Sequence, residues 1–137
     1  MKYSEDPEQK GSSQGNDFIV YRYADVLLSR AEALNEINGP SKEVTDLINQ
    51  VRTRAHVSTL NWQNYTKETL RGFLLEERGR ELYCEGHRRD DLIRHGKFIE
   101  KALEKGVAAK PYHVLFPIPQ SAMNENPNLV QNPGYEN

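Results

Sequence analysis

The amino-acid sequence predicts an all-α fold. Two observations carry this prediction: apolar residues recur at helical spacing over most of the chain, and prolines break the apolar run that lacks this spacing. With 137 residues, the chain has the length of one compact domain. Hydrophobic residues make up only 36% of the chain and the mean hydropathy is −0.81, which is lean for a self-sufficient core. We therefore expect part of the complete fold to lie outside this chain.

The first helix is predicted to begin near Tyr21. Its apolar residues follow the i, i+3, i+4, i+7 spacing of one helical face: Ala24, Leu27, Leu28, Ala31 and Leu34. Gly39 and Pro40 are expected to end the helix, because glycine suits the closing turn and proline cannot continue a helix.

A second helix is predicted to follow at once, with Ser41 as its N-cap. Its apolar face comprises Val44, Leu47, Ile48, Val51 and Ala55. Because the connection is short, the two helices should pack antiparallel as a hairpin. Such a pair resembles a single tetratricopeptide-type unit, and a lone unit needs neighbours to cover it.

Residues 56–65 are predicted to form a loop, because their aromatic and polar residues lack helical spacing. Thr66 can then cap a third helix, which is long, only partly apolar and expected to end near Gly86. Two shorter helices are predicted over residues 88–94 and 98–104. The middle of the chain is therefore expected to be helical throughout, apart from this loop.

The two ends of the chain have a different composition. Residues 1–17 contain almost no apolar side chain and are predicted to be a disordered lead-in. After Gly106 the chain is rich in proline and asparagine, and Pro117 and Pro119 exclude a central strand. We expect an extended segment there, with one turn of helix after Pro119. The predicted organisation is a lead-in followed by a single helical domain over residues 18–137.

The composition excludes several classes of function. A net charge of −2 gives no basic surface for phosphate contacts, so nucleic acid is not an expected partner. No stretch approaches the ~20 apolar residues that span a bilayer, and the start of the chain lacks the pattern of a secretory signal. The single cysteine, Cys84, cannot form an intramolecular disulfide and is expected to pack within the third helix.

The densest group of charged residues lies between Glu77 and Lys97. It allows three interpretations: a catalytic pair of carboxylates, a metal site, or a set of ion pairs that braces the helices. On a helix, each glutamate has an arginine three or four residues away, so opposite charges can meet. We therefore predict a structural ion-pair cluster. Its members are Glu77, Arg78, Glu81, Glu85, Arg88, Asp91 and Arg94.

The enzymatic and metal-binding interpretations are less consistent with these residues. An acid–base glycosidase needs one carboxyl group with a raised pKa, whereas neighbouring arginines favour the ionised form. His87 and Asp91 have helical i, i+4 spacing, but Arg88 and Arg89 lie between them and would repel a metal ion. We predict no catalytic residue, no metal site and no cofactor.

The candidate ligand-binding residues lie in the loop over residues 56–65. Trp62, Gln63 and Tyr65 combine flat apolar rings with an amide, a mixture that suits the face and hydroxyls of a sugar. The same rings could instead pin the loop to the core. Residue types alone leave both interpretations open.

Four separated stretches resemble the C-terminal portion of the SusD/RagB family, the outer-membrane nutrient-binding lipoproteins of Bacteroidetes. They are "YRYADVLLSRAEALNE" (21–36), "INQVRTRA" (48–55), "EERGRELYCEGHRRDDLIRHGK" (76–97) and "LFPIPQSAMNENPNLVQNPGY" (115–135). Each stretch is short, but their order and separation also resemble the family. Arg89 and His95 stand where the family usually has aromatic residues.

This resemblance implies a helical fold with tetratricopeptide-like pairs and a function without bond-making chemistry. Members of the family capture glycans or other nutrients at the cell surface and pass them to a TonB-dependent outer-membrane transporter. They are lipid-anchored and several times longer than this chain. The resemblance thus implies a C-terminal fragment that reaches the membrane only through a lipid anchor outside it, with an oligo- or polysaccharide and the transporter as partners.

A second function remains open from the residues alone. The hairpin over residues 21–55 could recognise a partner chain, which would make the protein a helical protein–protein interaction module that binds no sugar. An acid–base hydrolase is the third and least favoured function.

Overall fold

The computed structural model describes residues 6–8, 11, 15–17 and 19–136. Every regular element in that part of the chain is a helix, which confirms the predicted all-α class. No helix there is both long and apolar enough to cross a membrane. The chain divides into two compact units, Met1–Glu85 and Gly86–Asn137. Most of the predicted lead-in lies outside the described residues, and the single domain over 18–137 stays a prediction.

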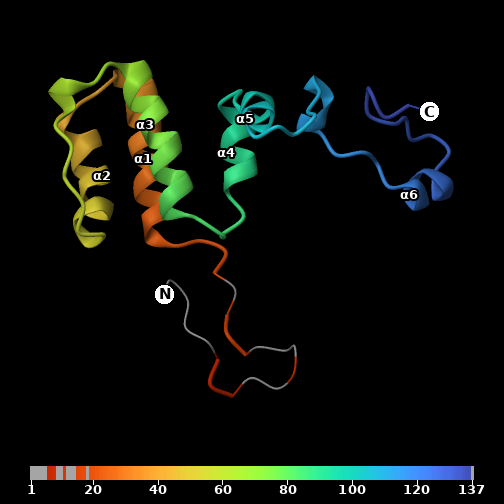
Figure 1. Cartoon of the computed structure of the whole chain (residues 1–137), viewed down its shortest axis with the longest axis horizontal. Helices are drawn as coiled ribbons and strands as arrows, with labels where there is room; N and C mark the ends of the chain where they lie inside the picture. The colour runs from red at the N-terminus through yellow and green to blue at the C-terminus, as the bar shows by residue number, and fades with distance from the viewer. Residues whose placement is uncertain (1–5, 9–10, 12–14, 18, 137) are drawn as a thin grey trace. The chain divides into compact units, whose positions relative to one another are not determined.

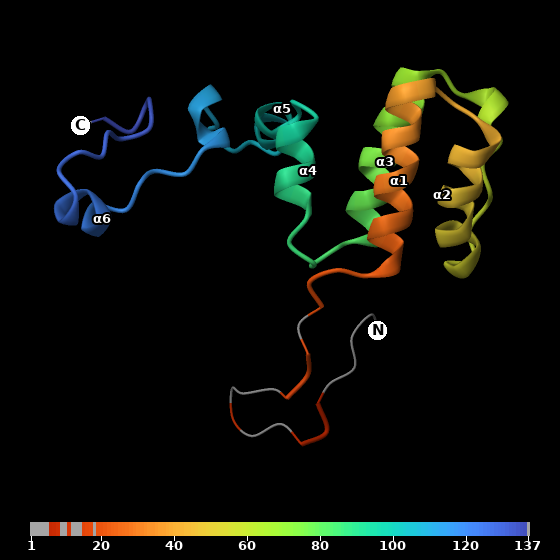
Figure 2. The ribbon, with the colours of Figure 1, turned by 180° about the vertical axis from the view of Figure 1, so that it is seen from behind.

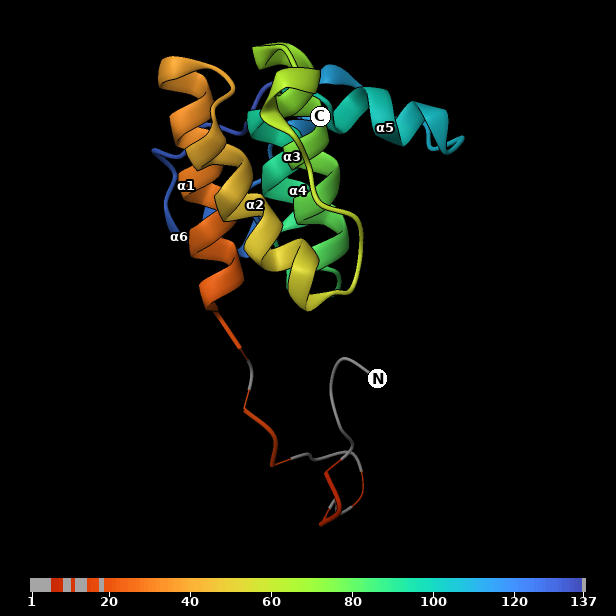
Figure 3. The same cartoon turned by 90° about the vertical axis from the view of Figure 1, so that its left-hand side faces the viewer.

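The first unit is a group of three helices: α1 (Tyr23–Asn38), α2 (Lys42–Arg54) and α3 (Lys67–Glu81). Figure 1 and Figure 2 show that α2 and α3 both run antiparallel to α1, which contacts each of them. Figure 3 shows α1 and α2 side by side along their length. The predicted helical hairpin is therefore confirmed.

Local hydrogen bonds end the first helix of the hairpin and cap the start of the second. Gly39 has a positive φ of 78°, and its amide donates to the Asn35 carbonyl at the end of α1. The Ser41 hydroxyl then accepts a hydrogen bond from the Val44 amide at 3.3 Å and caps α2. At the start of α3, the Thr66 hydroxyl caps the Thr69 amide in the same way. The predicted helix starts are confirmed at both caps.

The apolar core of the first unit lies between the three helices. Removing these side chains from water drives the helices together. Asn35 is fully buried among them, and its amide nitrogen donates to the Lys67 carbonyl at 3.0 Å, which ties α1 to the start of α3. The buried cluster comprises Ala24, Leu27, Leu28, Ala31, Val44, Leu47, Ile48, Val51, Leu70 and Leu74.

The outward faces of α1 and α2 differ in chemistry. The solvent-facing residues of α2 are mostly polar or charged, as in Lys42, Glu43 and Asp46. On α1, in contrast, Val26 and Ile37 are 55% and 74% exposed. Helical spacing predicts one apolar face for α1, whereas in the structure α1 also carries these apolar side chains away from the core.

Helix α3 ends earlier than predicted. Its last residue is Glu81, and residues 82–84 form a turn before Gly86. Cys84 has a positive φ of 63° and is exposed. The expectation that Cys84 packs inside the third helix was therefore wrong, because the chain leaves the helical conformation just before it.

The second unit contains α4 (Arg88–Arg94), α5 (Phe98–Glu104), the 3-10 helix η2 (Pro111–Val114) and α6 (Gln120–Glu125). The first two have the predicted bounds, and α6 is the turn of helix predicted after Pro119. Arg89 of α4 contacts η2 and the segment after it: its guanidinium lies 4.0 Å from the centre of the Phe116 ring and donates to the Val114 carbonyl at 2.9 Å. The same guanidinium lies 5.2 Å from the centre of the Phe98 ring of α5, so one cation contacts two aromatic rings in this unit.

The C-terminal residues fold back onto the segment after η2. The Gln131 side chain binds both the amide and the carbonyl of Ile118, at 2.8 and 2.9 Å. The Tyr135 hydroxyl donates to the Leu115 carbonyl at 2.9 Å, and its ring lies 4.9 Å from that of Tyr112. Gly134 lies directly against the Tyr112 ring, where a side chain would overlap it. The tail is held by side-chain contacts rather than by regular structure.

Candidate functional site

The loop between α2 and α3 is fixed by two side chains of α2. Asn49 accepts a hydrogen bond from the Leu60 amide at 2.7 Å and donates to the Leu60 carbonyl at 3.0 Å. One turn further on, Arg52 donates to the Ser58 carbonyl at 2.6 Å. Because two α2 residues hold its backbone, the loop lies along α2 in a defined conformation.

The tip of this loop is the 3-10 helix η1 (Trp62–Asn64), and it presents Trp62 to solvent. The Asn61 side chain accepts from the Gln63 amide at 3.1 Å and so caps η1. Trp62 is 39% exposed and Gln63 is also exposed. This arrangement places an indole ring and a carboxamide at the surface of a fixed turn.

Tyr65 is directed differently from Trp62. It is half-buried against the core, and its ring meets that of Phe73 edge to face, with centroids 5.8 Å apart. The Arg52 guanidinium lies over the same Phe73 ring at 5.3 Å. Trp62 and Gln63 are therefore accessible to a ligand, whereas Tyr65 anchors the end of the loop.

The predicted charged cluster is divided between the two units. Glu77, Arg78, Glu81 and Glu85 lie in the first unit, and Arg88, Asp91 and Arg94 lie in the second. In the second unit, Arg94 donates to the buried carboxylate of Asp91 at 2.8 Å.

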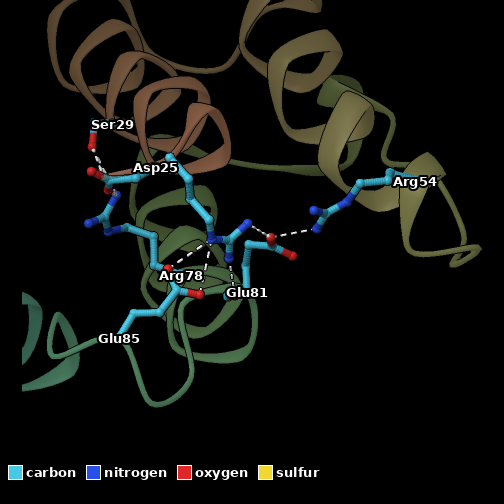
Figure 4. Close-up of polar contacts among 7 residues, drawn as sticks. Asp25, Ser29, Arg54, Arg78, Glu81 and Glu85 are labelled. Carbon is cyan, nitrogen blue, oxygen red and sulfur yellow. Dashed lines mark hydrogen bonds and ion pairs between the residues drawn. The ribbon is translucent and has the colours of Figure 1, made fainter. Parts of the chain in front are cut away.

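The carboxylates at the end of α3 meet Arg22, just before α1. Arg22 donates to both oxygens of Glu85, at 3.0 and 2.8 Å, and also binds the side chain and carbonyl of Glu81. The Glu85 side chain is only 2% exposed, so it depends on this partner. Burial alone would lower the pKa of Arg22, but its hydrogen bonds to Glu85 and Glu81 outweigh that effect and raise it. Arg54 of α2 reaches the same carboxylate of Glu81 (Figure 4).

Two further ion pairs link α3 to its neighbours. Arg78 binds Asp25 of α1 at 2.8 Å and donates to the Ser29 hydroxyl at 2.9 Å (Figure 4). Glu77 binds Arg52 of α2 at 2.9 Å and Arg80 of its own helix at 2.8 Å. Among these contacts, the Arg80 pair has the local i, i+3 spacing. The others join helices that are distant in sequence.

Glu77, Glu81 and Glu85 each lie against at least one guanidinium. Within the described residues, no group of three or more histidine, cysteine, aspartate or glutamate side chains is arranged to hold a metal ion. In the first unit, the ion pairs of Arg22, Arg78 and Glu77 therefore join α3 and the turn after it to α1, to the residue before α1 and to α2.

Two surface depressions adjoin the hairpin. The first, of about 460 Å³, lies between the start of α1 and the end of α2. It is lined by Arg22, Tyr23, Ala24, Leu27, Gln50, Val51 and Arg54. The second, of about 590 Å³, is open and lies along α2. Trp62, Gln63 and Tyr65 line neither of these two depressions.

The first depression was not located from the sequence, although the hairpin that forms it was singled out. Tyr23 and Gln50 come together only because α1 and α2 pack antiparallel. The signal that could have found it is Tyr23, a large aromatic residue outside the apolar face of α1. The sequence predicted the two helices, α1 and α2, but not the depression that lies between them.

Comparisons with known proteins agree on one family. The sequence matches the SusD family over residues 1–110 and 100–135. It is 33% identical over 138 residues to the starch-binding protein SusD of Bacteroides thetaiotaomicron, covering 95% of this chain and 24% of that protein. The chain thus spans about a quarter of the length of this curated relative.

Solved structures give the same result for the fold. A SusD homologue from Bacteroides thetaiotaomicron superposes with a TM-score of 0.75 at 33% identity, covering 93% of this chain and 30% of its own. A laminarin-binding SusD-like protein gives a TM-score of 0.70 at 31% identity, covering 91% of this chain and 26% of its own. The sequence match over nearly the whole chain and the shared fold lead to one conclusion: this chain belongs to the SusD family.

Proposed function

We propose that this chain is part of a non-catalytic glycan-binding protein of an outer-membrane nutrient uptake system. The observation that carries this proposal is its membership of the SusD family. One relative is named as starch-binding and a structural neighbour as laminarin-binding. Starch and laminarin are both polysaccharides of glucose, so a neutral oligo- or polysaccharide is the ligand class to test first.

Within this chain, we place the sugar contact at Trp62 and Gln63. The flat indole of Trp62 offers a stacking surface for the apolar face of a pyranose ring, and the Gln63 amide can donate to or accept from its hydroxyls. Because Asn49 and Arg52 already hold the loop, ordering it on ligand binding costs little free energy. Tyr65 contributes only the part of its ring that is not packed against Phe73.

The absence of catalysis in this proposal rests on the ion pairs. A glycosidase needs a protonated carboxyl group beside a second, ionised one. Glu77, Glu81 and Glu85 are each held by arginine and are largely withdrawn from solvent. The chain is therefore assigned to capturing a glycan, and not to cleaving it.

The proposed location and partner follow from the family. We place the protein at the outer surface of the outer membrane, held by a lipid anchor, with a TonB-dependent transporter receiving the glycan. The described helices supply no membrane-crossing segment. The transporter contact is proposed for the complete family architecture, of which this chain covers about a quarter.

The chain contains one tryptophan, so its fluorescence reports on the proposed site directly. Titration with soluble starch and with laminarin is expected to give a saturable change in Trp62 emission with at least one of them. Calorimetry should show that Trp62→Ala abolishes the binding heat and that Gln63→Ala weakens it. Tyr83→Ala, which removes an exposed ring outside the loop, serves as the control and should bind normally.

Flat fluorescence and calorimetric traces with both polysaccharides would count against this site. Binding that survives Trp62→Ala would place the site elsewhere in the chain while leaving the function intact. The second candidate function, a helical protein–protein interaction module, is favoured by the depression and the exposed apolar side chains on the α1–α2 hairpin. Saturable binding of a transporter by a chain that binds none of the glycans tested would support this second function.

A further inference from the structure

A stretch of the second unit is held by side chains on two sides. It consists of residues 113–118, which we call the strap; it begins in η2 and leads toward α6 (Figure 1). Pro117 lies within the strap and Pro119 follows it, so two positions lack the amide hydrogen that pairing with a strand requires. The carbonyl groups of the strap therefore need hydrogen-bond donors from elsewhere in the chain.

Arg89 of α4 holds the first part of the strap. One nitrogen of its guanidinium donates to the His113 carbonyl at 3.4 Å and to the Val114 carbonyl at 2.9 Å. The same guanidinium lies over the Phe116 ring. The Arg89 side chain is 29% exposed, so these contacts are partly withdrawn from water, which strengthens them. Arg89 thus combines hydrogen bonds to the strap backbone with a ring contact to a strap side chain.

The C-terminal tail, residues 131–135, holds the rest of the strap. The Tyr135 hydroxyl donates to the carbonyl at position 115 at 2.9 Å, and the Asn132 amide donates to the carbonyl at position 116 at 2.7 Å. The Gln131 side chain accepts from the Ile118 amide at 2.8 Å and donates to the Ile118 carbonyl at 2.9 Å. Five carbonyls between positions 113 and 118 are thus bound by side chains.

The two sets of contacts differ in chemistry. Arg89 is charged, and its hydrogen bonds to the strap belong to the stronger, charge-assisted class. The tail binds through neutral side chains, and each of them needs a strap carbonyl in a fixed position. Helix α6 ends at Glu125, so side-chain contacts decide where the tail lies. The tail therefore stays in place only while the strap does.

We propose that the strap and the tail form one opening segment whose closed state is held by Arg89. Arg89 keeps the carbonyls at positions 113 and 114 in place, and these fix the path of the strap, which presents its remaining carbonyls to the tail. Among the described residues, the hydrogen bonds of Arg89 go to the strap and not to the tail. Losing them nevertheless releases the tail. Because coupling of this kind is reciprocal, loss of a tail contact also loosens the strap.

The composition of the segment suits reversible opening. In the open state, the five strap carbonyls exchange their side-chain donors for water, which keeps the free-energy cost of opening small. Pro117 and Pro119 prevent the opened segment from adding to the edge of a sheet, so its release does not create an aggregation-prone strand. The proposal concerns contacts inside the second unit alone and does not depend on glycan binding.

Hydrogen exchange followed by NMR on the 137-residue chain tests the coupling. The reporters are the amide of Ile118 in the strap and that of residue 135 in the tail, with the His95 amide at the end of α4 as a reference. Arg89→Met keeps the aliphatic stem and removes the guanidinium. Tyr135→Phe keeps the ring and removes one hydroxyl. The control, Asp90→Asn, removes the charge of the next side chain along α4, which is 83% exposed.

Arg89→Met is expected to accelerate exchange at Ile118 and at residue 135 by one common factor of about ten, because both amides belong to one opening segment. Tyr135→Phe should accelerate both by a smaller common factor, about five. The His95 rate should stay within about twofold of the parent chain in every variant. Asp90→Asn should change none of the three rates.

An unchanged rate at residue 135 in Arg89→Met would overturn the proposal, because the tail would then be held independently of α4. An unchanged Ile118 rate in Tyr135→Phe would do the same. Equal acceleration at His95 would also overturn it, since Arg89→Met would then unfold the whole unit instead of opening one segment. An effect of Asp90→Asn as large as that of Arg89→Met would contradict it too, by assigning the change to the charge of α4.

Discussion

Replacing Arg78 with methionine would test whether the ion pairs of α3 stabilise the first unit or make no net contribution to its stability. Arg78 is 5% exposed, and its guanidinium binds Asp25 at 2.8 Å and the Ser29 hydroxyl at 2.9 Å. Methionine retains most of the aliphatic stem, so the packing of the side chain changes little. The substitution removes the charge and leaves the Asp25 carboxylate in a mostly buried position.

The expected magnitude follows from that geometry. Breaking a buried ion pair by removing one partner typically costs about 3–5 kcal/mol. The Asp25 carboxylate keeps some solvent contact, and the Ser29 hydroxyl still donates to it at 3.4 Å, so we expect the lower end of that range, about 3 kcal/mol. Domains of this size unfold with roughly 5–15 kcal/mol, so such a loss is a large share of the total.

Urea unfolding is a suitable assay, followed by circular dichroism and by the emission of Trp62, which lies in the first unit. The matched control is Arg80→Met. Arg80 is 60% exposed and shares Glu77 with Arg52, so its loss should cost less than about 0.5 kcal/mol. Adding Asp25→Asn to Arg78→Met should recover part of the loss, because the buried site then holds no unpaired charge.

Equal losses for Arg78→Met and Arg80→Met would refute the reasoning. So would a failure of Asp25→Asn to recover any stability in the Arg78→Met background. Either result would mean that the cost of withdrawing the charges from water cancels their attraction, and that the apolar core alone sets the stability of the unit.

Three further predictions concern a loop, a surface carboxylate and the tail. Asn49→Ala should lower the free energy of unfolding by about 1–2 kcal/mol and accelerate hydrogen exchange at the Leu60 amide, because both hydrogen bonds to Leu60 are lost. Hydrogen bonds from Arg71 hold the pKa of Glu36 below its ordinary value. The ionised Glu36 therefore stabilises the fold above about pH 4.3, and this stabilisation is lost as the pH falls through the folded pKa. Urea unfolding at pH 7 and pH 3 should therefore show a slightly smaller pH dependence in Glu36→Gln, by no more than about 0.5 kcal/mol for so exposed a pair. Gly134→Ala should accelerate hydrogen exchange in the tail about tenfold, since it adds a side chain at a positive φ and against the Tyr112 ring.

The loop and tail predictions each have a matched control variant, and the carboxylate prediction has a refuting outcome. Gln50→Ala, one residue after Asn49, should leave Leu60 exchange unchanged, and equal effects would remove the loop argument. For the carboxylate, an unchanged pH dependence in Glu36→Gln would show that its pair contributes nothing. Gly86→Ala introduces the same unfavourable φ in open space, so an effect on the tail as large as that of Gly134→Ala would contradict the role of the ring.

The helix boundaries could be predicted because their causes are local. The caps at Ser41 and Thr66 depend on hydroxyls within three residues of the amides that they bind. The end of α3 was misplaced because Gly86 was taken as the signal that ends the helix. The helix had already given way to a turn, in which a non-glycine residue, Cys84, adopts the left-handed conformation.

The partners of the charged cluster could not be predicted in the same way. Local spacing identified Arg80 as a partner of Glu77, but it gave no sign of Arg22, which lies 63 residues before Glu85. Such pairs depend on how whole helices pack. The same limit applies to Tyr65, whose direction toward Phe73 is set by the fold and not by the residues beside it.

The conformation around Cys84 has a practical consequence for future measurements. The chain has one cysteine, and its thiol is exposed in a turn outside the helices. A maleimide dye, spin label or surface linker will therefore attach at a single known point, without displacing a packed side chain. Two molecules can also become joined through these thiols in air, so a reductant belongs in any preparation whose mass is to be determined.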